Sequence, residues 1–132
     1  MRKNPVVHFE MPYENATRVV AFYSQAFGWE MQTLGQEMGD YITAATTETD
    51  QNHMVKQPGT INGGFFPKKP DWPAPYPSVV IAVQDIKQAM KGVERAGGKI
   101  LGEPVEIPNI GQYVSFTDTE GNRVSLLQPK GM

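Results

Sequence analysis

The sequence predicts an α+β protein in which two βαβββ modules form a paired mixed sheet that encloses a groove. Three observations predict this class. Helical and alternating patterns in residues 1–66 return in residues 78–132 at a constant offset of seventy residues. Five prolines in residues 67–77 forbid a helix between the two halves and favour a stiff connection. Short alternating segments surround each helical pattern, as strands with one buried face do.

Each half contains one amphipathic helix of about three turns. Apolar residues recur at i, i+3, i+4 and i+7 in residues 16–27 and again in residues 86–96. Asn15 and Asp85 precede these patterns and are residue types that cap helix N-termini. Gly28 and Gly98 follow at matching positions, so we expect each helix to end in a left-handed glycine.

One strand precedes each helix and three follow it. The first strand of each half alternates apolar and polar or small residues, and the segment 118–122 has the composition of a hairpin turn. The strands expected in the first half are residues 7–11, 29–34, 40–47 and 61–66. Those expected in the second half are residues 78–83, 99–107, 112–117 and 123–127.

The alternation assigns side chains to the two faces of each sheet. Phe9 and Met11 should meet the first helix, which leaves His8 and Glu10 on the open face. In the second half the open face should carry residues 78, 80 and 82 of one strand and residues 125 and 127 of the last. Two such sheets placed edge to edge would enclose a groove lined by open-face residues, where a ligand could bind.

Length and composition narrow the function classes. The chain of 132 residues suits one domain (residues 1–132), with residues 67–77 linking the modules 1–66 and 78–132. The absence of cysteine excludes a disulfide scaffold, a thiolate zinc site and a cysteine nucleophile. A net charge of −2 without a basic patch argues against nucleic-acid binding, and the short apolar runs argue against a membrane span. Without an apolar segment after the early cations, we expect a cytoplasmic protein without a signal peptide.

Several motifs resemble those of the vicinal oxygen chelate superfamily, which includes glyoxalase I, extradiol dioxygenases and bleomycin-resistance proteins. The first half carries HFEMP at residues 8–12, Phe22-Tyr23 and FGW at residues 27–29. The second half carries VQD at residues 83–85, AGGK at residues 96–99 and DTEGNR at residues 118–123. The resemblance covers nearly the whole chain and implies a glyoxalase-like fold, and it does not specify a reaction because this fold hosts many.

The resemblance also implies where metal ligands would lie in related enzymes. Transferred residue by residue, the four positions fall on His8, near Gly63, on Ser78 and on Ser125. Only His8 is a strong ligand for a divalent ion, because serine hydroxyls are poor ligands and glycine has no side chain. Glu10 could add one oxygen from the same strand, but that pair would hold an ion weakly. We therefore expect no cofactor and no stoichiometric tightly bound metal, with a divalent ion on unusual ligands as the alternative.

His8 and Glu10 are the candidate catalytic pair. The carboxylate could raise the imidazole pKa and create a general base, or the pair could be a structural contact in the groove. Phe65, Trp72 and Tyr113 could line a pocket for a planar or apolar ligand, together with the hydroxyls of Ser78 and Ser125. The alternative places a phenylalanine in the core and Trp72 over the proline linker.

Two functions follow from these residues. The first is a small-molecule-binding protein of the glyoxalase or bleomycin-resistance type that lacks the complete metal site. The second is a glyoxalase- or dioxygenase-like enzyme, a lyase or oxidoreductase, that uses His8 and Glu10. A purely structural module would leave the groove unexplained. Because the modules leave edge strands and because related proteins often pair, we expect a homodimer, with Phe27 and Trp29 as a contact patch.

Overall fold

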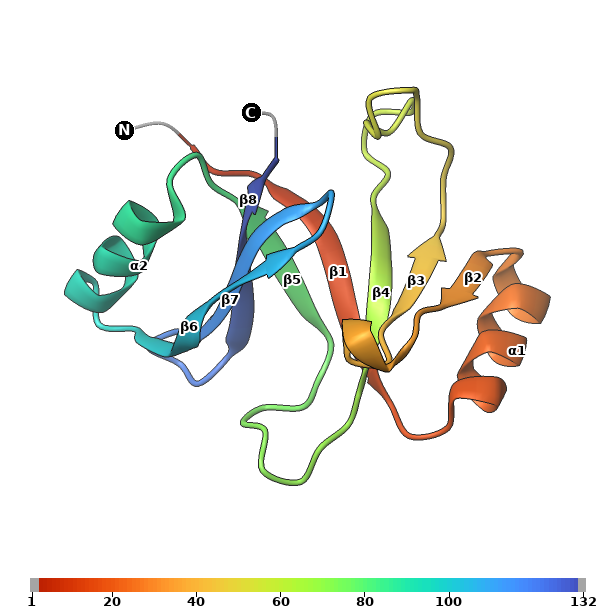
Figure 1. Ribbon diagram of the computed structural model, residues 1–132, viewed down its shortest axis with the longest axis horizontal. Helices are drawn as coiled ribbons and strands as arrows, with labels where there is room; N and C mark the ends of the chain where they lie inside the picture. Colours follow the sequence, from red (N-terminus) through yellow and green to blue (C-terminus); the bar gives the residue numbers. More distant parts are fainter. Residues whose placement is uncertain (1–2, 131–132) are drawn as a thin grey trace. The chain divides into compact units, whose positions relative to one another are not determined.

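The computed structural model describes residues 3–130, and these residues form two compact units (Figure 1). One unit runs from His8 to Pro77. The other begins at Ser78 and includes the short segment before His8. Among the helices of residues 3–130, none is long and apolar enough to cross a membrane.

The unit 8–77 contains a four-stranded mixed sheet and one α-helix. Its strands lie in the order β2-β3-β4-β1, in which β1 and β4 are parallel and the other neighbours antiparallel. The elements are β1 (Val6–Tyr13), α1 (Ala16–Phe27), β2 (Glu30–Thr33), the short 3-10 helix η1 (Gln36–Met38), β3 (Ile42–Ala45) and β4 (Asn62–Pro67). The first residues of β1 belong to the other unit.

The second unit repeats this topology. Its strands lie in the order β5-β8-β7-β6, with β5 and β8 parallel and the other neighbours antiparallel. The elements are β5 (Ser78–Ala82), α2 (Ile86–Arg95), β6 (Lys99–Ile107), β7 (Gly111–Thr117) and β8 (Arg123–Pro129). The same βαβββ order in both units confirms the repeat and the α+β class predicted from the sequence.

The helix ends agree with the sequence at three of four positions. The Asn15 side chain accepts a hydrogen bond from the Arg18 N–H at 2.9 Å, and Asp85 does the same for the Gln88 N–H at 3.2 Å. Gly28 adopts the left-handed conformation with φ 72°. The expectation for the second helix end is wrong, because α2 ends at Arg95 and the left-handed glycine is Gly97, with φ 103°.

Gly98 is needed for a close approach instead. Its N–H donates to the Val93 carbonyl at 2.9 Å, which closes the end of α2. A Cβ built on Gly98 would lie 2.7 Å from a methyl carbon of Val93 and 3.0 Å from the Thr117 carbonyl oxygen. Glycine therefore allows the backbone to turn tightly from α2 into β6.

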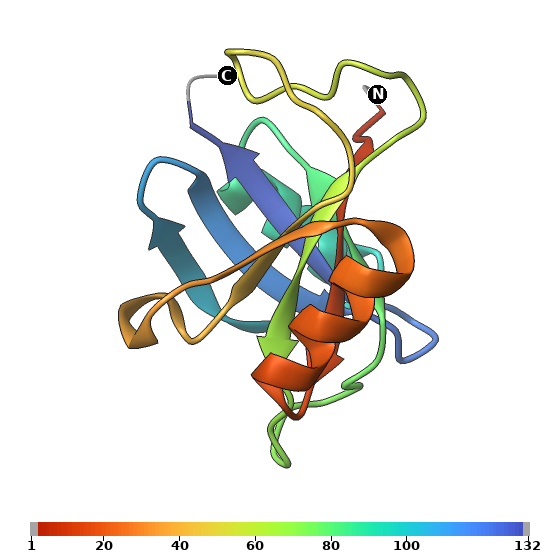
Figure 2. The same ribbon diagram turned by 90° about the vertical axis from the view of Figure 1, so that its right-hand side faces the viewer.

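Each helix covers one face of its own sheet. In the unit 8–77, Phe9 and Met11 pack under α1 with the buried core residues Ile42, Ala44 and Phe65, and Figure 2 shows α1 in front of these strands. In the second unit, the core under α2 consists of Val83, Ile86, Val114, Phe116 and Leu126. The predicted register of β1 is confirmed, so His8 and Glu10 lie on the face opposite α1, which we call the helix-free face.

Candidate functional site

A phenol joins the two candidate residues of β1. The Tyr41 hydroxyl donates a hydrogen bond to Glu10 Oε2 at 2.9 Å, and His8 Nε2 lies 3.3 Å from the same hydroxyl oxygen. Glu10 is 5% exposed, so its carboxylate depends on such partners. His8 and Glu10 are two residues apart on one strand face, while Tyr41 comes from the segment just before β3. We call these three side chains the His8–Tyr41–Glu10 cluster.

The diglycine of β4 makes room for this cluster. The register pairs Phe9 with Gly63 and Glu10 with Gly64, so these glycines lie on opposite faces of the sheet. A Cβ on Gly64 would overlap the Tyr41 ring and hydroxyl, and a Cβ on Gly63 would overlap the Phe9 ring. Gly64 is therefore the glycine of the helix-free face, whereas Gly63 belongs to the core side. Both glycines let an aromatic ring lie directly on the strand.

Hydrogen bonding assigns the tautomer of His8. Because Tyr41 gives its only proton to Glu10, the His8 contact requires Nε2 to donate to the phenol oxygen. Nδ1 then carries the lone pair. Burial lowers the pKa of His8 from 6.5 to about 4, so the imidazole is neutral at neutral pH. The expectation that Glu10 raises this pKa is wrong, since removal of the ring from water dominates.

The depressed pKa gives a testable pH dependence. In the unfolded chain the imidazole has its ordinary pKa of 6.5, so that state takes up a proton that the folded state resists until about pH 4. Stability present above pH 6.5 should thus fall by roughly 2 kcal/mol as the pH drops to 4, a value reduced for partial exposure. In urea unfolding, the wild type should show this loss of stability between pH 6.5 and 4, and His8→Gln should lack it. An NMR titration of His8 with a midpoint at or above 6.5 would contradict the assignment.

Aromatic side chains lie farther along the same face of β4. Phe66 is opposite Pro12 in the register, and its ring centroid lies 5.7 Å from that of Trp72 in the proline-rich segment. The Lys69 ammonium lies 5.0 Å from the centre of the Trp72 ring, within cation–π range. The structure corrects the expected placement of Phe65, which is 1% exposed and contacts Phe9 and Tyr23 on the core side. A one-residue alternation gives Phe66 to the helix-free face.

The second unit carries hydroxyl groups on its helix-free face. Ser125 Oγ lies 2.7 Å from the Tyr113 hydroxyl and 2.9 Å from Ser115 Oγ, and Arg123 Nη2 donates to Ser115 Oγ at 3.4 Å. Ser125 is 1% exposed and lies opposite Ser115 in the β7–β8 register. Val80 of β5 is opposite Ser125 in the register, and Ser78 is two residues before Val80, so Ser78 lies on the same face. The structure thus joins Tyr113 and Ser125 directly and gives Ser78 no bond to either.

The family model of the Glyoxalase/Bleomycin resistance protein/Dioxygenase superfamily matches residues 6–126. The chain belongs to this superfamily. Its glyoxalase-like α+β fold is thereby shown, and the resemblance read from the motifs is confirmed.

Relatives by sequence carry similar descriptions. A glyoxylase-like domain-containing protein of Didymella fabae is 28% identical over 116 residues, which are 86% of this chain and 84% of that protein. A putative glyoxylase of Mycobacterium bovis is 31% identical over 81 residues. That match covers 60% of this chain and 31% of the longer relative.

Solved structures of the superfamily fold superpose over nearly the whole chain. Methylmalonyl-CoA epimerase of Streptomyces coelicolor has a TM-score of 0.69 at 13% identity, with 96% of this chain and 97% of that chain covered. A hypothetical protein of Bacillus halodurans has a TM-score of 0.67 at 14% identity, with 99% and 98% covered. At this identity the likeness establishes the fold alone.

The donor groups of the described residues do not fit the four-ligand metal site implied by the superfamily. Within residues 3–130 no three His, Cys, Asp or Glu side chains lie close enough together to hold an ion. His8 and Glu10 both bond to one phenol, and Ser125 belongs to a hydroxyl network. Neutral hydroxyls bind divalent ions poorly, so the hydroxyls of the second unit do not replace the missing ligands.

Sequence reasoning missed Tyr41, Ser115 and Arg123. Ser115 could have been found, because it is two residues from Tyr113 on a predicted strand and therefore shares its face. Tyr41 likewise alternates with Thr43 in the segment expected as a strand. The pair Gly63-Gly64 was a further signal for Tyr41, since glycine in a strand leaves room for the close approach of other groups.

Proposed function

We propose that this protein binds a small organic molecule on the helix-free face of the unit 8–77, without the complete metal site of the superfamily. The observation that carries this is the His8–Tyr41–Glu10 cluster. Gly64 has no side chain and so leaves room on β4 for the Tyr41 ring, whose hydroxyl contacts both His8 and Glu10. Such preorganised polar groups beside aromatic surface are typical of ligand sites.

The chemistry of the cluster suggests how a ligand would be held. A neutral His8 with Nε2–H committed to Tyr41 offers Nδ1 as an acceptor for a hydroxyl or amide donor. Trp72, which is half-buried and packs on the buried Phe66 ring, offers apolar ring surface near the same strand face. The ligand class that fits is a molecule with a hydrogen-bond donor next to a planar or apolar part. Of the residues expected to bind ligand, His8, Glu10 and Trp72 belong to the unit 8–77, whereas Ser78, Tyr113 and Ser125 lie in the second unit.

An enzyme is the second candidate, and Glu10 favours it. A largely buried carboxylate within 2.9 Å of a phenol could move a proton to or from a substrate, as a general base or acid. One sequence relative is described as a glyoxylase-like domain-containing protein and another as a putative glyoxylase, and an epimerase shares the fold. His8 is a weak base at neutral pH, because burial lowers the pKa of its imidazole from 6.5 to about 4.

Binding is tested by native mass spectrometry of the purified protein with a metabolite mixture. Tyr41→Phe should weaken a captured ligand by about tenfold, because removal of the phenol oxygen leaves His8 and Glu10 without their shared partner. Tyr76→Phe is the matched control, since Tyr76 is 68% exposed in the proline-rich segment. No retained ligand, or equal loss in both variants, would contradict the proposal.

Elemental analysis of the same sample separates the two functions. The binding function expects no stoichiometric divalent ion after gel filtration. About one metal per chain, lost in His8→Ala, would instead support the metal-dependent enzyme. Turnover of glyoxalase- or dioxygenase-type substrates without added metal would support the enzyme that uses Glu10 alone.

We also propose that the protein is a cytoplasmic homodimer. Phe27 is 62% exposed at the end of α1, and an exposed aromatic ring of this size favours a protein contact. Trp29 supports the patch less than expected, because its ring stacks on Tyr23 at 4.8 Å within the core. A solution mass near twice 14.6 kDa is the signature of the dimer.

A further inference from the structure

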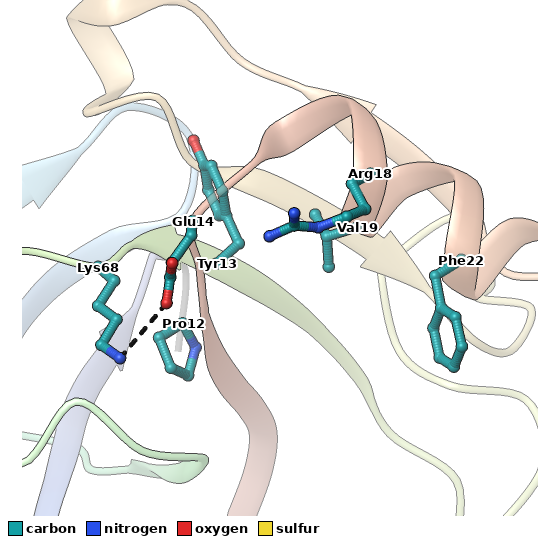
Figure 3. Close-up of a pocket in the computed structure, with 7 residues that line it drawn as sticks. All are labelled: Pro12, Tyr13, Glu14, Arg18, Val19, Phe22 and Lys68. Atoms are coloured by element: carbon teal, nitrogen blue, oxygen red, sulfur yellow. Dashed lines mark ion pairs between the residues drawn. The ribbon is translucent and has the colours of Figure 1, made fainter.

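A concave surface lies in the unit 8–77, at the junction of β1 and α1. It has a volume of about 390 Å³ and is lined by seven residues from β1, the turn that follows it, α1 and the chain after β4 (Figure 3). These residues are Pro12, Tyr13, Glu14, Arg18, Val19, Phe22 and Lys68. None belongs to the His8–Tyr41–Glu10 cluster. We call this surface the α1 pocket.

The charges of the α1 pocket do not cancel. Lys68 Nζ forms an ion pair with Glu14 Oε1 at 3.5 Å, which neutralises both groups. Arg18 extends from the first turn of α1 toward this pair, as Figure 3 shows. Among residues 3–130, Arg18 has no acidic side chain within ion-pair distance. One guanidinium charge is therefore available to an anion, and its planar N–H groups suit a carboxylate.

The remaining wall of the pocket is apolar. Phe22 is 57% exposed one turn after Arg18, and Val19 and Pro12 lie between the helix and the strand end. The Tyr13 hydroxyl already donates to the Asp40 carbonyl at 2.6 Å, so that ring contributes mainly its carbon surface. Arg18 and Phe22 lie one helical turn apart and extend toward opposite ends of the pocket, which gives it one charged end and one apolar end (Figure 3).

We propose that the α1 pocket binds small organic monoanions that carry an aromatic or branched apolar body. The carboxylate pairs with Arg18, and the body lies against Phe22, Val19 and Pro12. Charge complementarity selects the anion, and the volume lies in the lower part of the range of small-molecule pockets, roughly 300–1,000 Å³. Because the site is open to solvent and contains one unpaired charge, we expect an affinity on the order of millimolar.

The test uses three probes and NMR. Phenylacetate carries both ends of the proposed ligand, phenylacetamide lacks the charge, and acetate lacks the ring. Titration of the ¹⁵N-labelled full chain with phenylacetate should shift the amides of Arg18, Val19 and Phe22 in a saturable way. Phenylacetamide and acetate should each bind at least about fivefold more weakly, since each loses one of the two contacts.

Two pairs of variants locate the site. Arg18→Gln should weaken phenylacetate by about fivefold or more, while Arg95→Gln, which removes the same charge from α2, should have no effect. Phe22→Ala should weaken it similarly, while Tyr76→Ala, which removes an exposed ring outside the pocket, should have no effect. All four side chains are exposed, so the fold should tolerate each change.

The results of this phenylacetate test can be distinguished from those that test ligand binding at the His8–Tyr41–Glu10 cluster. Equal losses in Arg18→Gln and Arg95→Gln, or saturable shifts confined to other residues, would overturn the α1 pocket. Unchanged phenylacetate binding in Tyr41→Phe is expected, because no residue of the His8–Tyr41–Glu10 cluster lines this pocket. Loss of phenylacetate binding in Tyr41→Phe alone would assign the anion to the other site and overturn the inference.

Discussion

Replacement of Phe65 with alanine is expected to lower the free energy of unfolding by about 4 kcal/mol. The ring is 1% exposed and lies 5.1 Å from the Tyr23 ring and 6.5 Å from the Phe9 ring, measured between centroids. Truncation removes the apolar surface of a large side chain and leaves a cavity that the rigid sheet and α1 cannot close. The lost apolar burial and the cavity both lower the free energy of unfolding, so this variant should be among the most destabilising in the unit 8–77.

Chemical denaturation measures this loss, and Tyr76→Ala is its control. A ring of similar size is removed at a position that is 68% exposed, so the free energy of unfolding should change by less than about 0.5 kcal/mol. A cost below about 1 kcal/mol for Phe65→Ala would show that Phe65 is not a core residue. Phe65 would then again be a candidate ligand-binding residue, as the sequence suggested.

The contrast between Phe65 and Phe66 shows how far the sequence can predict a site. Periodicity identified the helices, most strands and the faces of β1, because burial imposes a period on local sequence. In β4 the flanking residues are two glycines and a second phenylalanine, so no alternation marks which ring faces the core. Only the pairing of Phe9 with Gly63 and of Pro12 with Phe66 resolves it.

The pKa of His8 could not be predicted from the sequence, for a different reason. Its neighbour Glu10 is visible in the sequence, and a nearby carboxylate raises an imidazole pKa. The removal of the ring from water depends on how distant segments pack, and this effect lowers the pKa to about 4. Local patterns do not reveal Tyr41 as a partner either, since it lies thirty-three positions after His8 in the chain. Local patterns therefore predicted the residues of β1 but not the chemistry that their surroundings impose.

Gly64→Ala should have the second largest effect, a loss of about 3 kcal/mol, at the upper end for overpacking. An added Cβ would overlap the Tyr41 hydroxyl and ring, so Tyr41 must leave the strand and its bond to Glu10. The matched control is Gly92→Ala in α2, where a Cβ meets nothing within 4 Å. There alanine should stabilise the helix by roughly 0.5–1 kcal/mol, so the same substitution has opposite signs at the two sites.

A double-mutant cycle attributes the Gly64 effect to Tyr41. Tyr41→Ala removes the atoms that the new Cβ would overlap, so Gly64→Ala should cost less than about 1 kcal/mol in that background. The coupling energy, about 2 kcal/mol, measures how closely the phenol lies on the glycine backbone. Urea unfolding of the four proteins provides all terms of the cycle. If Gly64→Ala carries its full penalty in the absence of Tyr41, the strand itself requires glycine. The penalty would then not come from overlap with the Tyr41 ring.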